Sequence, residues 1–121
     1  MKIEIEELRK MILMGCKYYH VEVKRCKVLL KDEIYLYISG KYNRVPIMAD
    51  IKITCKSKSK KIILLVDGEV RYGFLNLDLL RLLQQYLKLP YVTVTQNEIV
   101  ITQPWIDTIK IHPNEIEISL I

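Results

Sequence analysis

The sequence predicts an α+β fold in which a curved antiparallel β-sheet, built as a meander, wraps around one long amphipathic helix. Residues Asn76–Leu89 carry a long run of leucines at helical spacing. Most of the remaining chain alternates apolar and polar residues with the period of two that is typical of β-strands. The chain has 121 residues, of which 50% are hydrophobic. This size suits one domain with a real core, and we expect residues 1–121 to form a single domain.

The helix predicted at Asn76–Leu89 has an apolar arc that covers roughly half of its circumference. The arc consists of Leu79, Leu80, Leu82, Leu83, Tyr86, Leu87 and Leu89. Asn76 is the predicted N-cap, and Pro90 ends the helix because it disfavours helical backbone at the residue before it. So broad an arc favours a concave sheet as its cover, although an ordinary flat sheet is an equally good partner.

The first fifteen residues fit two structures. Lys2–Glu6 alternates like a strand, whereas Glu6–Met14 consists of good helix formers. Gly15 is a suitable residue to end a helix. We expect a short N-terminal helix at about residues 4–14.

Eight strands are expected in the rest of the chain, on both sides of the leucine-rich helix. They are expected over residues 21–30, 34–38, 47–55, 62–72, 91–95, 99–102, 108–111 and 116–120. The apolar phase slips near Arg25, which indicates a bulge or a break. Asn43-Arg44 is a predicted turn, and Gly68 is expected to allow a bend. This order predicts an antiparallel meander, one long helix and then more antiparallel strands.

The net charge of +5 is unevenly distributed. Residues 1–61 hold 15 Lys and Arg against 7 Asp and Glu, whereas residues 62–121 hold 4 against 7. A basic half attracts an anionic partner or simply forms a solvated face, and the second interpretation is favoured. The densest run supplies four lysines as candidate contacts to an anionic surface: Lys56, Lys58, Lys60 and Lys61. The competing and favoured interpretation is a solvated hairpin loop whose lysines deter edge pairing.

No catalytic motif is recognisable in the sequence, and we expect no enzymatic activity, no metal and no cofactor. Cys16 and His20 have a spacing that suits two metal ligands on a helix, but no second pair accompanies them. The remaining candidates, Cys26, Cys55 and His112, are scattered. The opening residues have no apolar signal region, and no run approaches the roughly 20 apolar residues of a spanning helix. We therefore expect a cytoplasmic protein with reduced thiols.

The order of elements also resembles a known family. Strands such as Glu33–Gly40 and Ile47–Cys55 precede the leucine-rich Asn76–Leu83, and Leu89–Val94 and the hairpin at Ile109–Ile118 follow. This order is similar to the C-terminal part of the tubular lipid-binding (TULIP-like) proteins, especially the small bacterial lipid-binding proteins of the DUF2993 type. The similarity covers roughly Val21–Ile121. It implies a strongly curved sheet around a long helix, with lipid held in the apolar interior. The chain is shorter than a full domain of that family and lacks the signal peptide of its bacterial members.

The function expected from these features is a non-catalytic binding module for lipid or another apolar ligand, held between sheet and helix. The candidate ligand-binding residues are Leu79, Leu83, Tyr86, Leu87, Ile51 and Ile53. One alternative is a protein-interaction module with a filled core that assembles as an edge-paired homodimer. Contact with a membrane surface, without spanning it, is also compatible with the basic half. A further alternative is a basic nucleic-acid-binding domain. Nucleic acid is nevertheless a disfavoured partner, because no segment matches the aromatic and basic signatures of the common RNA-binding modules.

Overall fold

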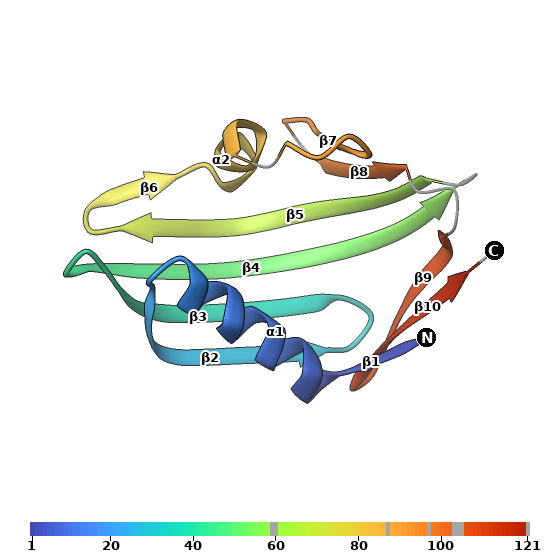
Figure 1. The fold of residues 1–121 in the computed structure, drawn as a ribbon, viewed down its shortest axis with the longest axis horizontal. Helices are drawn as coiled ribbons and strands as arrows, with labels where there is room; N and C mark the ends of the chain where they lie inside the picture. Colours follow the sequence, from blue (N-terminus) through green and yellow to red (C-terminus); the bar gives the residue numbers. More distant parts are fainter. Residues whose placement is uncertain (59–60, 87, 97, 103–105, 121) are drawn as a thin grey trace.

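The computed structural model describes residues 1–58, 61–86, 88–96, 98–102 and 106–120. In this part of the chain it contains two helices and ten strands, and every strand pair is antiparallel. The predicted α+β class with an antiparallel sheet is therefore confirmed. The strands form two separate sheets, which Figure 1 shows as a long sheet and a smaller one beside it.

The larger sheet has seven strands. They are β2 (Glu22–Leu30), β3 (Ile34–Tyr42), β4 (Val45–Lys58), β5 (Lys61–Tyr72), β6 (Leu75–Leu77), β7 (Val92–Val94) and β8 (Glu98–Thr102). β2, β3, β4 and β5 form the predicted meander. The edge of β5 that does not pair with β4 is shared by two strands. β8 pairs with residues 61–65 of β5, and β6 pairs with residues 70–72. Residues 66–69 between them are the part of this edge that α2 approaches.

Local turn chemistry explains the meander. Asn43 and Arg44 both have positive φ, 49° and 66°, as a two-residue hairpin turn of type I′ requires. The predicted slip near Arg25 is confirmed as a register shift between Val23 and Arg25. Gly68 has a φ of 137°, and a Cβ there would collide with the carbonyl of Asp50 on β4. Only glycine therefore fits at this position of β5, which continues as a strand in regular register with β4.

The pairing register divides the larger sheet into an apolar and a polar face. One row of side chains across β2 to β5 consists of Cys26, Ile38, Ala49 and Val70. The next row, on the opposite face, consists of Lys27, Tyr37, Asp50 and Glu69. Because side chains alternate along a strand, the same division continues along β4, whereas residues 62–65 of β5 are apolar on both faces. The apolar face must be covered or remain in contact with water.

Helix α1 (Ile5–Tyr18) covers the β2 end of the apolar face (Figure 1). The buried core there consists of Cys26, Val28, Leu30 and Ile116, and Ile5, Leu8 and Ile12 of α1 pack against it. The N-terminal helix was expected to be short and to end before Gly15. Instead it has 14 residues and passes through Gly15.

The end of α1 explains this error. His20 has a φ of 62°, and its N–H donates to the Lys17 carbonyl at 3.1 Å, while the Val21 N–H donates to the Cys16 carbonyl at 2.8 Å. These two bonds form a Schellman ending with His20 in the left-handed position. Gly15 costs the helix about 1 kcal/mol relative to alanine, which tertiary packing outweighs.

Helix α2 (Leu79–Tyr86) has only eight residues, so the helix predicted at Asn76–Leu89 is too long. The structure does not confirm a sheet wrapped around it. Asn76 lies in β6 and pairs with Arg71, so it is not the N-cap. That role belongs to Asp78, whose Oδ1 accepts a hydrogen bond from the Arg81 N–H at 3.3 Å. The sequence pattern overestimated the helix because β5 recruits residues 75–77 as a strand.

The smaller sheet contains β1 (Lys2–Glu4), β10 (Glu115–Leu120) and β9 (Ile106–His112), in that order. β9 and β10 form the predicted closing hairpin, with Asn114 at a φ of 72° in its turn. Their pairing with the first residues of the chain was not predicted. The Ile109 N–H donates to Ser57 Oγ at 3.2 Å, which joins this sheet to the end of β4.

Candidate apolar binding surface

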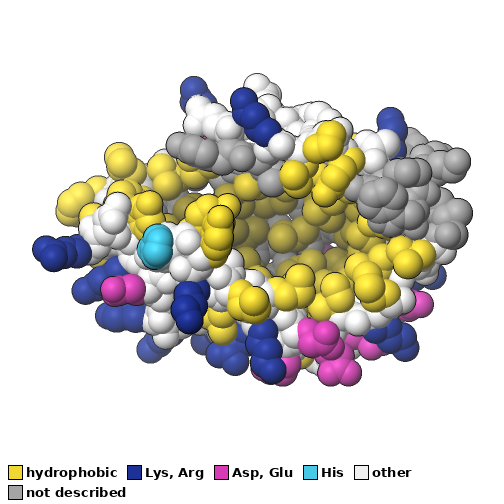
Figure 2. Space-filling view, viewed as in Figure 1, with side chains coloured by type: hydrophobic (Ala, Val, Ile, Leu, Met, Phe, Trp, Pro, Cys, Tyr) yellow, Lys and Arg dark blue, Asp and Glu magenta, His cyan; other side chains and the backbone are white. Residues whose placement is uncertain are grey.

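The middle of the apolar face forms a trough between the two helices. Figure 2 shows this region as a hollow lined by hydrophobic side chains. By register, its floor consists of Ile47, Ala49, Ile51, Ile53, Val66 and Val70. Ile51 and Val70 are buried, and the other four are half-buried. We call this surface the trough. It is a continuous aliphatic floor over β4 and β5.

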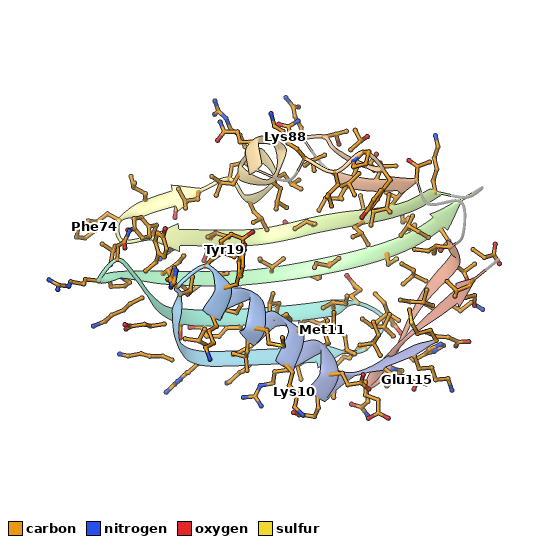
Figure 3. The ribbon with its side chains drawn as sticks, in the orientation of Figure 1. Lys10, Met11, Tyr19, Phe74, Lys88 and Glu115 are labelled. Carbon is orange, nitrogen blue, oxygen red and sulfur yellow. The ribbon has the colours of Figure 1, made fainter. Side chains whose placement is uncertain are left out.

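One rim of the trough is a flank of α1. Leu13 and Lys17, on one flank of the helix, line a pocket of about 430 Å³ together with Val23 of β2. Met11 and Tyr18 are seven residues apart and so share the other flank, which borders the trough. Their exposed fractions are 57% and 77%. Figure 3 shows Met11 and Tyr19 on the side of α1 nearer to β4, and Lys10 on the far side.

The turn between β5 and β6 forms one end of the trough. Phe74 follows Gly73, whose φ is 61°, and the ring is fully exposed at 106%. Figure 3 shows Phe74 at this end of the sheet. Leu75 pairs with Tyr72, is 62% exposed and belongs by register to the apolar face. Exposed apolar side chains grouped around an apolar hollow are typical of an interaction surface, which makes the trough the candidate binding surface.

The structure brings together two of the predicted ligand-binding residues. Leu79 and Ile51 line one pocket of about 260 Å³ between α2 and β5, together with Val66 and Leu80. Leu80 was not among the predicted site residues, although it is the most deeply buried leucine of α2.

The other predicted residues are more dispersed. Ile53 lies in the trough floor, two positions along β4 from Ile51, and Leu83 is half-buried on α2. Tyr86 is the last residue of α2, and Leu87 lies outside the described residues. Of the predicted residues, the structure thus places Leu79 and Ile51 at one pocket and Ile53 further along the same strand as Ile51.

Sequence reasoning missed the rim. Met11, Tyr18 and Phe74 look like ordinary surface or core residues when the sheet is unknown. A signal was present for α1, because Met11 and Tyr18 lie off the arc of Ile5, Leu8 and Ile12. No comparable periodic signal marks Phe74, which lies in a turn.

The predicted lysine cluster lies away from the trough. β4 continues to Lys58, which pairs with Lys61, so the predicted loop is shorter than expected. Lys60 lies outside the described residues. Lys56 and Lys61 are exposed, and their register places them on the polar face. An anion bound there would not share a surface with an apolar ligand in the trough.

Groups with chemical reactivity are few in the described chain. Those residues contain no cluster of three or more His, Cys, Asp or Glu side chains that could hold a metal ion. His112 Nε2 lies 3.0 Å from Glu117 Oε2, as a cross-strand pair on β9 and β10. Among the residues described, neither helix is long and apolar enough to cross a membrane.

The cysteines Cys16, Cys26 and Cys55 are free thiols. Burial raises the pKa of the Cys16 thiol, and the neighbouring Cys26 raises it further. Burial also raises the pKa of Cys55. A raised pKa keeps both thiols protonated at neutral pH, so they are poor nucleophiles there.

The chain matches no family model, no curated protein and no solved structure. The resemblance to tubular lipid-binding proteins therefore remains a prediction.

Proposed function

We propose that this protein is a non-catalytic module that binds a lipid or another long apolar molecule in the trough. One observation carries the proposal: an aliphatic floor that runs across β4 and β5 lies between two helices that do not close over it (Figure 2). Half-buried aliphatic side chains lose their remaining contact with water when a ligand covers them. Each Å² of apolar surface removed from water contributes about 25 cal/mol.

The shape of the trough favours an elongated ligand. Ile47 and Ile53 are six residues apart on one strand, which corresponds to about 20 Å. An extended acyl chain has a comparable length. The pocket at Leu79 and Ile51 measures about 260 Å³, which is below the roughly 300 to 1,000 Å³ of a typical ligand site. It would therefore hold one end of a ligand whose remainder lies along the floor.

The polar groups at this pocket restrict the ligand further. Asp78 and Gln96 line it beside Leu80. The carboxylate of Asp78 is part of the α2 cap, and it repels a second negative charge at that position. The end of the ligand that enters the pocket is therefore expected to be apolar or uncharged.

The test is ligand binding by a pair of variants on one strand. Ala49 and Met48 are neighbours on β4 with side chains on opposite faces, so Ala49→Gln alters the trough and Met48→Gln alters the polar face. Native mass spectrometry of gently purified protein should show a bound apolar molecule, and a fluorescent fatty acid should bind to the wild type. Ala49→Gln should weaken that binding roughly tenfold, because it places an amide in the apolar floor.

Met48→Gln should bind the fluorescent fatty acid like the wild type. Thermal melts of both variants provide the control for folding. If the wild type carries no apolar molecule and binds no fatty acid, or if both variants lose binding equally, the proposed function is wrong.

A further inference from the structure

We propose that a second copy of the same chain covers the trough, so that two protomers meet with their apolar faces together. This inference rests on the proposed function because it takes the trough as the ligand-binding surface. It adds the identity of the partner that covers the trough. The two open troughs then form one enclosed apolar chamber. The binding surface of one protomer has a floor and rims but is open to solvent on one side. The apolar face of the partner covers that side and completes the site.

The surface area of the chain supports this assembly. Its accessible surface is 8854 Å² at a mass of 14.3 kDa. A compact monomer of that mass exposes about 6,800 Å², so the chain exposes roughly 2,000 Å² more than expected. An obligate homodimer buries at least about 2,000 Å² in total, or about 1,000 Å² on each copy, so the excess is large enough to supply such an interface.

The composition of the rim fits an interface between proteins. Met11, Tyr18, Tyr19, Phe74 and Leu75 are all more than half exposed. Aromatic residues and methionine are enriched in protein interfaces relative to the remaining surface. Because a two-fold interface uses the same patch on both copies, an apolar rim around an apolar floor is complementary to itself.

A ligand alone does not close the trough. Sites for small molecules bury about 70 to 90% of the ligand surface, whereas an open floor leaves one side of an acyl chain in water. A facing protomer supplies a second aliphatic floor at that side. This arrangement also explains why the pocket at Leu79 and Ile51 is small, since the main volume forms only between two copies.

Pairing through β2, which is one form of the edge-paired homodimer that the sequence offers as an alternative, is disfavoured. β2 is the terminal strand of the larger sheet and carries Lys24, Arg25 and Lys27. Antiparallel pairing of two β2 strands about Cys26 places Arg25 opposite Lys27 twice. Like charges directly opposite each other destabilise a strand pair, and basic residues on an edge are a common protection against it.

The closing experiment measures the mass of the full chain by sedimentation equilibrium and by native mass spectrometry. Met11→Glu and Phe74→Glu introduce a charge on the rim, and Leu29→Glu is the matched control. Leu29 is 57% exposed, like Met11, but by register it lies on the polar face. The wild type should be a dimer. Each rim variant should raise the dimer dissociation constant roughly tenfold or more, because a charge is desolvated at the interface. Leu29→Glu should leave that constant unchanged.

Salt provides a second measurement. Each protomer has a net charge of +5, so two copies repel each other, and salt screens this repulsion. The dimer should therefore become tighter as the salt concentration rises. Binding to an anionic surface would weaken instead.

The outcomes separate this inference from the proposed function. A dimer with an apolar molecule bound supports both, and a dimer without one supports the assembly and contradicts the ligand. A monomer that still binds the fatty acid overturns the assembly and leaves the proposed function intact. A monomer at all concentrations that binds only anionic vesicles or another protein overturns both. A dimer that Leu29→Glu disrupts as strongly as Met11→Glu also overturns the face-to-face arrangement.

Discussion

The two helices lie on the same sheet but differ in what they bury. α1 has 14 residues and packs over a core that contains Cys26, Val28 and Leu30 from β2 and Ile116 from β10. α2 has eight residues, contributes Leu80 as a buried residue and leaves a pocket of about 260 Å³ beside β5. Yet α2 has the stronger leucine pattern. The strength of a helical pattern thus reports how apolar one face is, whereas the packing partners decide how much that face buries.

The partners differ because α1 is supported by two sheets. β2 lies beneath it, and the hairpin of β9 and β10 contributes Ile116 and Ile111 to the same core. α2 contacts β5 and β7, and the Nε2 of its Gln84 donates a hydrogen bond to the Val94 carbonyl at 2.9 Å. Regions with fewer buried contacts open at lower free energy, so we expect the α2 end to open first.

The largest effect should come from truncating one buried leucine at each helix, Leu30 of β2 beneath α1 and Leu80 of α2 itself. Leu30→Ala should lower the free energy of unfolding by about 4 kcal/mol, because Leu30 is 4% exposed and its loss leaves a cavity in the main core. Leu80→Ala should cost about 2 kcal/mol, since its surroundings already border a pocket and can relax. Urea denaturation of both variants measures the difference. Equal losses would show that the two ends are packed equally well.

The start of α2 provides a sharper test of its length. Asp78→Ala should cost about 1 kcal/mol, because it removes the side-chain acceptor for the Arg81 N–H. Asn76→Ala, at the cap expected from the sequence, should have almost no effect, since Asn76 is an exposed residue of β6. Urea midpoints of the two variants are compared directly. A larger loss for Asn76→Ala would restore the longer helix.

The middle of α1 should accept a stabilising change. A Cβ at Gly15 meets nothing within 4 Å, and α1 continues through this position. Gly15→Ala should therefore raise the free energy of unfolding by roughly 0.5 to 1 kcal/mol, because alanine loses less backbone entropy in a helix. Thermal unfolding of the variant shows the gain as a higher Tm. A destabilised Gly15→Ala would mean that α1 ends near Gly15, as the sequence alone predicts.

The smallest effect concerns pH. The folded protein holds the pKa of Cys16 and Cys55 above the ordinary value of 9.0, so it favours the protonated thiols. Their contribution to stability is complete below that value and is lost as the pH rises above it, because the unfolded chain releases its thiol protons first. The wild type should lose slightly more stability above pH 9 than the Cys16→Ala, Cys55→Ala double variant. Urea midpoints at several alkaline pH values measure this difference, and identical slopes would contradict it.

Much of the fold could be predicted because its signals are local. The register shift near Arg25 and the turn at Asn43-Arg44 both follow from residue types at neighbouring positions. The candidate site was predicted less well. Leu79 and Ile51 share a pocket, but the rim residue Phe74 carries no periodic pattern.

The sequence by itself determined where the chain is extended, where it turns and which side chains of each strand share a face. These properties depend on a few consecutive residues and on alternation. Only the tertiary structure decided the length of both helices, the pairing of β1 with β10 and the open trough. Each depends on which distant strand competes for the same backbone groups: β5 draws residues 75–77 into a strand, and β10 holds residues 2–4 in front of α1. The outcome depends on the difference in free energy between alternative long-range contacts, and no local sequence pattern predicts that difference.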